Sequence, residues 1–414
     1  MHWVEQDLVN KQLSLPFKVV QLSTSYKGGA ALASRRLNKS LNRIGVDSEF
    51  VSISKTEFIL EPHESDIERR PIETIFGYTF SVFSKFISKK TPFSLFGTNL
   101  IKIGQDTKLK LNGNTIIHVH NWFNLISHLQ VINLALANIP VVVTLHDQRF
   151  FTGGCHNSYE CEEFMNSCKN CPKLPKIFKT IPNFNHQKLS EFLNTKVDNL
   201  KFIAPSKWML AQAKKSTLLK NQDVRFIPNT LGDFSSTPIN KKINTSDKLK
   251  VGIASVDKNA YLKGGDILKE IQSKIENCKL NIELIFLSDV LKQQDMNAFW
   301  GNLDILLVPS RAENSPNVIH EAKSLGIPIL ASDVGGISEL LHPDYDHLIS
   351  LKDLNAEYIL QQLLGIKPDI SEKNRAEIKK RFSNYSQNSV SQHIELYQEV
   401  LNCVKVNSSV DHCY

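Results

Sequence analysis

The chain has 414 residues, of which 41% are hydrophobic and 22% are charged, and its net charge is +7 at neutral pH. This composition is that of a globular protein with a real hydrophobic core, and the length allows two or three domains. The mild basicity suits phosphorylated substrates, an anionic membrane surface or nucleic acid, and does not choose among them.

Membrane insertion and secretion find no support in the sequence. No apolar stretch reaches the roughly 18 residues that a membrane-spanning helix needs. The N-terminal stretch MHWVEQDLVNKQLSLPF lacks the apolar centre of a signal peptide. We therefore expect a cytoplasmic protein.

The first elements form a strand, a loop, a helix and a second strand. Residues 17–22 are a short apolar run typical of a strand, and Gly28 and Gly29 form a flexible turn. Residues 30–44 follow a helical pattern that Gly45 ends. Such a βαβ unit predicts a parallel sheet covered by helices.

Short apolar runs continue along the chain and are separated by helix-length segments or short loops. They read TIIHVH, IPVVVTLH, KFIAPS, VRFIPN, LKVGIAS, NIELIFLS, DILLVPS and IPILASD. We interpret each as a strand, which predicts α/β architecture throughout.

Two segments differ from this pattern. Residues 231–248 are polar and rich in Ser, Asn and Lys, which is typical of a linker. Residues 69–97 mix aromatic and apolar side chains with Lys and Arg. That mixture suits a membrane-surface segment, and it suits a core helix with a basic solvent face better.

Four of the seven cysteines form a cluster with the spacing C-x5-C-x6-C-x2-C, namely Cys155, Cys161, Cys168 and Cys171. The terminal C-x2-C pair with two nearby thiols predicts a tetrahedral structural zinc site. Free thiols and disulfides are the alternatives, and a cytosolic chain favours metal over disulfides. Four thiolates leave no open position on the ion, so we expect no catalytic zinc.

Seven residues separate two glutamates, Glu313 and Glu321, in the stretch SRAENSPNVIHEAKSLGIPILASDVGG. The run DILLVPS before them predicts a buried strand ending at Ser310. Ser315 followed by Pro316 predicts a helix start, with Ser315 as the N-cap, and the helix covers 316–325.

This arrangement suits a nucleoside diphosphate sugar. The predicted helix begins near Asn317 and Val318, and a helix N-terminus binds anions such as phosphates. Glu321 lies at the edge of the buried helix face, further along the axis. A carboxylate accepts hydrogen bonds from two neighbouring hydroxyls, so Glu321 would bind the ribose and Glu313 the sugar.

The stretch also resembles the E-x7-E signature of retaining glycosyltransferases of family 4. The match continues through GIPILASDVGGISELL and extends from the first βαβ unit to NYSQNSVSQHIELYQEVL. The resemblance implies the GT-B fold, in which two Rossmann-like, doubly wound parallel-sheet domains face a central cleft. We expect an acceptor-binding domain over 1–235 with a Cys-rich loop at 155–171, a linker at 236–247, a sugar-nucleotide-binding domain over 248–387, and a C-terminal helix at 388–414 that packs back on the N-terminal domain.

The resemblance also implies roles for individual residues. It makes Glu313, Lys263 and His146 the expected catalytic residues and His120 an acceptor-side candidate. The expected donor-binding residues are Glu321, Asn314, Ser315, Pro316, Asn317, Val318, Gly28 and Gly29. Relatives carry an arginine soon after the strand that precedes Lys263, whereas this chain reads GIASVDK there, and Lys258 is a candidate substitute with different spacing.

The function that follows is retaining transfer of a sugar from a nucleotide sugar to a glycan or lipid-linked oligosaccharide in cell-surface polysaccharide, lipopolysaccharide, capsule or exopolysaccharide synthesis. No catalytic metal is expected, because Lys263 and the helix dipole neutralise the phosphates. No nucleic acid is expected either. The location would be the cytoplasm, with an anionic membrane surface at the inner face as a candidate partner. The alternatives are an inactive sugar-nucleotide-binding subunit and a basic zinc protein that binds nucleic acid.

Overall fold

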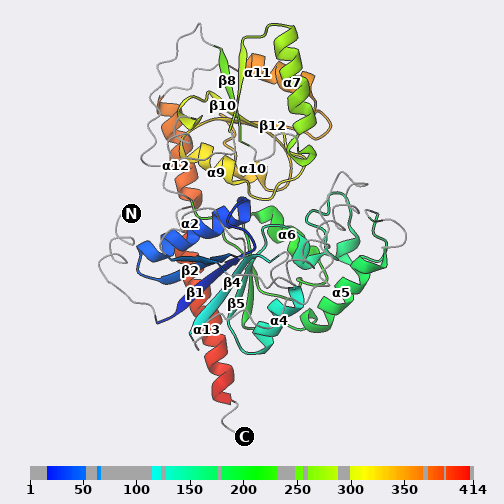
Figure 1. Ribbon diagram of the computed structural model, residues 1–414, viewed down its shortest axis with the longest axis vertical. Coiled ribbons are helices and arrows are strands. Elements are labelled where there is room, and N and C mark those ends of the chain that lie inside the picture. Colours follow the sequence, from blue (N-terminus) through cyan, green and yellow to red (C-terminus); the bar gives the residue numbers. More distant parts are fainter. Residues whose placement is uncertain are drawn as a thin grey trace. The chain divides into compact units, whose positions relative to one another are not determined.

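The computed structural model describes residues 16–52, 63–66, 114–122, 127–172, 174, 179–231, 248–254, 260–287, 299–366, 372–386 and 388–410. The chain divides into two compact units, which Figure 1 shows. The first unit is Met1–Thr230 together with Asn388–Tyr414, and the second is Leu231–Gln387. The basic, aromatic segment at 69–97, the linker at 236–247 and Lys258 lie outside the described residues.

The first unit contains a seven-stranded sheet in the order β3-β2-β1-β4-β5-β6-β7. All of its neighbouring strands are parallel. This is the strand order of a Rossmann fold, with a reversal between β1 and β4. The strands are β1 (Lys18–Ser23), β2 (Asp47–Ser52), β3 (Glu64–Asp66), β4 (Thr115–Asn121), β5 (Val141–Thr144), β6 (Leu200–Ala204) and β7 (Val224–Phe226).

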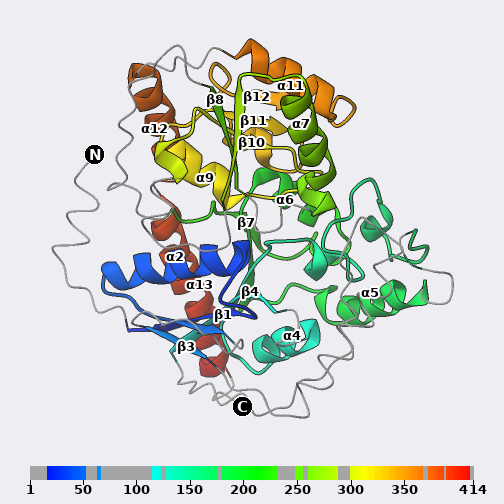
Figure 2. The same ribbon diagram turned by 45° about the horizontal axis from the view of Figure 1, so that its top comes forward.

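Helices cover both faces of this sheet because its strands alternate apolar side chains between two cores. Val19, Ile116 and Val142 pack against α2 (Gly29–Arg43) and the returning helix α13 (Ser389–Val410). Val20, Ile117 and Val143 face the opposite core, to which α4 (His128–Leu136), α5 (Thr180–Leu193) and α6 (Lys207–Lys215) contribute. Figure 2 shows α2 and α4 on opposite sides of β1 and β4.

The second unit contains a five-stranded parallel sheet in the order β12-β11-β10-β8-β9. The order reverses between β8 and β10, as in other doubly wound sheets. The strands are β8 (Leu249–Ile253), β9 (Ile282–Phe286), β10 (Ile305–Val308), β11 (Ile329–Ser332) and β12 (His347–Ile349).

The helices of the second unit also divide between the faces of its sheet. One core joins α9 (Asn317–Ser324), α10 (Ile337–Leu340) and α12 (Glu372–Ser386) to Leu306 and Val308 of β10. The other joins α7 (Gly265–Asn277) and α11 (Ala356–Gly365) to Ile305 and Leu307 of the same strand. The α/β class with two doubly wound parallel sheets, predicted from the sequence, is therefore confirmed.

Local signals account for several helix ends. Ser127 caps α4 through a reciprocal capping box with Gln130. At the end of α9, Gly326 has a φ of 71° and the N–H of Ile327 donates to the carbonyl of Ala322, as in a Schellman motif. Within the described part of the chain, no helix combines the length and apolar composition needed to cross a membrane.

Candidate active site

The predicted site residues of the second unit lie where its strand order reverses. Lys263 follows β8, and Glu313 follows the neighbouring strand β10. Open parallel sheets bind ligands at the carboxyl ends of strands on either side of such a reversal. The predicted strand end was wrong by two residues, because β10 ends at Val308 and Ser310 belongs to the loop that follows.

An ion pair joins Lys263 to Glu313. Lys263 Nζ donates to Glu313 Oε1, and Ser310 Oγ donates to the same oxygen at 2.9 Å. The Glu313 side chain is only 10% exposed, whereas that of Lys263 is 43% exposed. The ammonium group is thus held by a nearly buried carboxylate and remains accessible to an anionic ligand.

Two glycines let the backbone form this contact. Gly264 has a φ of 77°, and a Cβ there would lie 2.3 Å from the carbonyl oxygen of Pro309. Gly335 has a φ of 60°, and its Cβ would lie 1.7 Å from the carbonyl oxygen of Glu313. Any other residue would add both a clash and an unfavourable left-handed conformation. These glycines therefore fix the loops that carry Lys263 and Glu313.

Arg311 fastens the Lys263 turn to the same loop, and the sequence interpretation missed this residue. Its backbone N–H donates to the carbonyl of Leu262 at 2.8 Å, and its guanidinium binds Asp266 with two bonds of 2.7 and 2.8 Å. The guanidinium carbon also lies 3.8 Å from the centre of the Tyr261 ring. Its position two residues before Glu313 is the one local signal that could have found it.

Helix α9 begins directly after this loop, but its cap differs from the prediction. Pro316 is the N-cap and Asn317 the first helical residue, with Val318 next in the first turn. Ser315 does not cap the helix. It lies one residue before the N-cap, and its Oγ is 2.7 Å from Nε2 of His320.

The remaining donor-site candidates surround the start of α9. The carbonyl of Asn314 accepts from Gly336 at 3.1 Å, which joins the Gly335–Gly336 turn to the Glu313 loop. Glu321 is 3% exposed and lies on α9, within the second unit's core region.

The first unit places its own candidates at its own strand reversal. Gly28 is the N-cap of α2 with a φ of 95°, and nothing lies within 4 Å of the position of its Cβ. Gly29 is the first residue of that helix. Across the reversal, His120 lies near the end of β4, and its Nδ1 is 3.1 Å from Nε2 of His146. His146 was predicted to end a strand, but β5 ends two residues earlier at Thr144.

Burial keeps both histidines neutral near pH 7. It lowers the pKa of His146 to about 4, with Asp147 opposing and Arg149 reinforcing the shift. Burial and the neighbouring histidines lower the pKa of His120 well below its usual range. Neutral imidazole can accept a hydrogen bond from a ligand hydroxyl, which imidazolium cannot.

A buried ion pair supports the loop after His146. Arg149 binds Asp147 at 2.6 Å and donates to Oδ1 of Asn121 at 3.0 Å, so it joins the ends of β5 and β4. Burial alone would raise the pKa of Asp147, but the Arg149 guanidinium lowers it to about 2. This pair therefore joins the loop that contains His146 to the end of β4.

Comparison with known proteins identifies the domain at the Lys263–Glu313 contact. Residues 251–365 match the family described as Glycosyl transferases group 1. The second unit carries a glycosyl transferases group 1 domain. The predicted relationship to glycosyltransferases is thereby confirmed.

Two curated proteins are similar in sequence to this chain. Protein CapJ of Staphylococcus aureus is 27% identical over 191 residues, covering 40% of this chain and 48% of CapJ. The chain thus spans about half the length of that relative. The "Putative colanic acid biosynthesis glycosyl transferase WcaC" of Escherichia coli (strain K12) is 24% identical over 323 residues, covering 70% of this chain and 77% of WcaC.

Solved structures show the fold. Sucrose-phosphate synthase from Thermosynechococcus elongatus superposes with a TM-score of 0.60 at 14% identity, covering 94% of this chain and all of that one. Anabaena HepE in complex with UDP-glucose has a TM-score of 0.50 at 16% identity, covering 94% of this chain and 99% of HepE. The predicted GT-B fold is confirmed.

The predicted zinc site is not supported. Cys155, Cys161, Cys168 and Cys171 line one small cavity. Yet no three His, Cys, Asp or Glu side chains in the described ranges are arranged to hold a metal ion. Cys155 and Cys171 pack with Leu174 in a small apolar cluster, whereas Cys168 belongs to the main core. None of the four cysteines forms a disulfide in the part of the chain that the structure describes, and burial raises the pKa of Cys168 to about 12.

Proposed function

We propose that this protein is a retaining glycosyltransferase that takes a sugar from a nucleoside diphosphate sugar. The observation that carries the proposal is the contact between Lys263 and Glu313 at the strand reversal of the glycosyl transferases group 1 domain. In this contact, the accessible ammonium group of Lys263 would stabilise the leaving diphosphate. The Glu313 carboxylate would accept hydrogen bonds from sugar hydroxyls.

The donor would bind around the start of α9. Its phosphates would lie at the N-terminus of that helix, where first-turn N–H groups and the helix dipole favour anions. Asn314, Ser315, Pro316, Asn317 and Val318 form this segment. Glu321 would accept from the ribose hydroxyls and Glu313 from the sugar, while Lys263 neutralises charge on the diphosphate.

In the transfer step, the acceptor hydroxyl oxygen bonds to the anomeric carbon as the bond from that carbon to the diphosphate oxygen breaks. The hydroxyl proton passes to an oxygen of the departing diphosphate. Attack from the face that the leaving group vacates gives retention. Lys263 and the α9 dipole balance the negative charge that develops on the diphosphate.

The acceptor would bind to the first unit. His120 with His146 offers neutral imidazole to a sugar hydroxyl. Gly28, with nothing within 4 Å of its Cβ position, leaves the start of α2 open to the donor phosphates or the acceptor. The similarity to WcaC, a putative colanic acid biosynthesis glycosyl transferase, supports a glycan or lipid-linked oligosaccharide acceptor in cell-surface polysaccharide synthesis, such as lipopolysaccharide, capsule or exopolysaccharide.

The proposed location is the cytoplasm, including the inner face of the cytoplasmic membrane. The basic, aromatic segment would supply the membrane contact. Co-sedimentation with anionic phospholipid vesicles should fall when Lys85, Lys89 and Lys90 are replaced together by glutamine. Co-sedimentation that is the same in this variant and in the wild type would refute the membrane contact.

The donor site is tested first by calorimetric titration with UDP-, GDP-, ADP- and dTDP-sugars. Each donor that binds is then titrated into Glu321→Gln, which keeps the side-chain shape but removes the charge. Glu283→Gln, an exposed position on β9, is the matched control. We expect one nucleotide class to bind, with affinity lost in Glu321→Gln and retained in Glu283→Gln.

Equal affinity in wild type and Glu321→Gln would refute the assigned donor site. Release of free nucleoside diphosphate on addition of a glycan acceptor then separates an enzyme from an inactive binding subunit. Binding without release, over a broad acceptor panel, would favour the inactive subunit. A shift of nucleic acid in a gel at physiological salt would instead favour the nucleic-acid-binding alternative.

A further inference from the structure

A chain of buried polar side chains connects Tyr397 of the C-terminal helix α13 to His146. It lies on the face of the first sheet that α2 and α13 cover. The period of two along each strand places Gln21 after Val19, His118 and His120 after Ile116, and Thr144 after Val142. The polar residues therefore continue an apolar stripe toward the carboxyl ends of the strands.

Helix α13 completes this chain of contacts with Tyr397. The Tyr397 hydroxyl lies 2.7 Å from Nδ1 of His118, and the side-chain nitrogen of Gln21 donates to it at 3.3 Å. The side-chain oxygen of Gln21 is 2.6 Å from Nε2 of His120. Gln21, His118 and Tyr397 are fully buried and His120 is 3% exposed, so protein groups rather than bulk water decide these bonds.

Gln21 sets the direction of the bonds between it and His146, because an amide oxygen only accepts and an amide nitrogen only donates. His120 must therefore carry its proton on Nε2, which leaves Nδ1 as an acceptor. His146 must then donate to that Nδ1 from its own Nε2, 3.1 Å away. A neutral His146 has no second ring proton, so its Nδ1 is an acceptor.

The other side of Gln21 is compatible with a continuation of this set. Tyr397 accepts from the amide nitrogen, and its hydroxyl can donate its own proton to Nδ1 of His118. Nε2 of His118 then carries a proton, which it donates to the Thr144 hydroxyl at 2.8 Å. The five bonds form one consistent set of donors and acceptors from Thr144 to His146.

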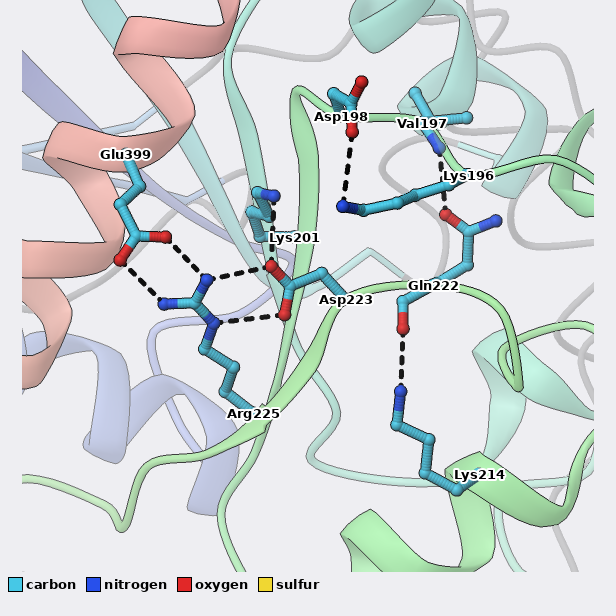
Figure 3. A network of polar contacts seen from close by, with 9 residues as sticks. All are labelled: Lys196, Val197, Asp198, Lys201, Lys214, Gln222, Asp223, Arg225 and Glu399. Carbon is cyan, nitrogen blue, oxygen red and sulfur yellow. Dashed lines mark hydrogen bonds and ion pairs between the residues drawn. The ribbon is translucent and has the colours of Figure 1, made fainter.

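Contacts at the surface hold α13 in the register that this set requires. Two hydrogen bonds join the helix to β7, since Arg225 binds Glu399 at 2.9 and 2.6 Å, and Arg225 also binds Asp223 at 2.9 Å (Figure 3). Lys201 on β6 adds a third contact to Asp223 at 3.0 Å. Glu399 is two residues beyond Tyr397, so this ion-pair cluster fixes the helix where Tyr397 enters the core.

We propose that Gln21 and Tyr397 are positioning residues that determine which ring nitrogen of His120 and of His146 carries a proton. His146 then meets its ligand as a hydrogen-bond acceptor at Nδ1. This inference rests on the proposed function, in which that ligand is a sugar hydroxyl. It assigns to the C-terminal helix a part in the chemistry at the end of β5.

The test is ring-nitrogen NMR of protein labelled with ¹⁵N-histidine, recorded without substrate, with each signal assigned by replacing one histidine at a time. In the wild type, we expect the His120 and His146 protons on Nε2. In Tyr397→Phe, Gln21 loses an acceptor and His118 a donor, so the His120 and His146 signals should shift. Turnover should fall roughly 5-fold, as expected for one hydrogen bond of about 1 kcal/mol, with KM nearly unchanged.

Tyr345→Phe is the matched control, because it removes a hydroxyl that binds Glu377 at 3.0 Å in the second unit. It should change neither the signals nor the turnover. Gln21→Met repeats the test from the other side if Tyr397→Phe fails to fold, and it should also shift the His146 signal.

A proton on Nδ1 of His146 in the wild type, or signals unchanged in both variants, would overturn the proposal. Shifted signals with unchanged turnover would also overturn it, because the tautomer would then be irrelevant to the reaction. Wild-type signals as expected in a protein that transfers no sugar would refute the proposed function while supporting the tautomer assignment.

Discussion

Gly335 lies so close to Glu313 that no side chain fits between them. The position of a Cβ on Gly335 is 1.7 Å from the carbonyl oxygen of Glu313, and the backbone there has a φ of 60°. The glycine pair that follows β11 is thus a structural partner of the glutamate loop, because it supports the backbone from which Glu313 reaches Lys263.

Gly335→Ala should destabilise the second unit and displace Glu313. The left-handed conformation costs about 1–2 kcal/mol for a residue with a Cβ, and the clash adds to that. We expect a lower Tm and weaker sugar-nucleotide binding. Gly365→Ala is the control, since nothing lies within 4 Å of its Cβ position. Equal Tm and affinity in the two variants would show that the Gly335 contact is unimportant.

Lys263→Met should separate catalysis from stability. The lysine is 43% exposed, so the loss of its ion pair should cost no more than about 1 kcal/mol. Loss of a charge that stabilises a leaving diphosphate should lower kcat by about 10²–10³-fold. Lys274→Met, which removes an exposed pair with Glu270, should leave kcat unchanged. A change of less than threefold in the kcat of Lys263→Met would exclude the proposed role.

Stability should fall as the pH decreases from about 6.5 to 4. Burial lowers the pKa values of His146 and His393 to about 4 and those of His128 and His156 to about 3. In the unfolded chain these groups titrate near 6.5, so the unfolded state binds more protons in this window and acid favours it. Urea unfolding at pH 7.5, 6 and 5 measures the slope.

His128 provides the sharpest variant for that experiment. It is buried between Trp122 and Phe150, and neither ring nitrogen has a hydrogen-bond partner among the residues that the structure describes. His128→Leu should raise the free energy of unfolding by about 1–3 kcal/mol and flatten the pH slope. His347→Asn, at an exposed position on β12, should change neither. A His128→Leu protein that is less stable at pH 5 would contradict the prediction.

The thiols should react according to their burial. Cys278 is exposed, whereas Cys155, Cys168 and Cys171 are buried. Because burial raises the pKa of Cys168 to about 12, its reactive thiolate is scarce. We expect a thiol reagent to modify Cys278 at least about 10-fold faster than the three buried residues, as followed by mass spectrometry. The prediction would be wrong if elemental analysis found one zinc ion per chain and if removal of that ion made the buried thiols reactive. The cysteines would then be zinc ligands.

The sequence predicted the elements with strong local signals. The β1–α2 unit was found because an apolar run precedes a glycine turn and a periodic helix. The three-residue strands β3 and β12 were missed because they are too short to show a period of two. Ser315 was wrongly assigned as an N-cap because its partner, His320, is set by the folded geometry.

Contacts between distant residues were the harder part of the site. Lys263 and Glu313 were each predicted, but their contact spans 50 positions and depends on how Gly264 and Gly335 pack. Tyr397 contacts residues more than 270 positions away and has no local motif, so no pattern pointed to it. Gln21 could have been found, because a polar residue in register with buried apolar neighbours on one strand face needs a partner.

The return of α13 to the first unit has a consequence for synthesis of the protein on the ribosome. Leu396, Tyr397, Val400 and Leu401 complete the core that begins with Phe17 and Val19. Until these residues leave the ribosome, one apolar face of the first sheet remains partly uncovered. Chaperones would bind that face, or nascent chains would aggregate through it. Truncation before residue 396 should therefore lower the stability of the first unit more than that of the second unit, which is synthesised just before the truncation point.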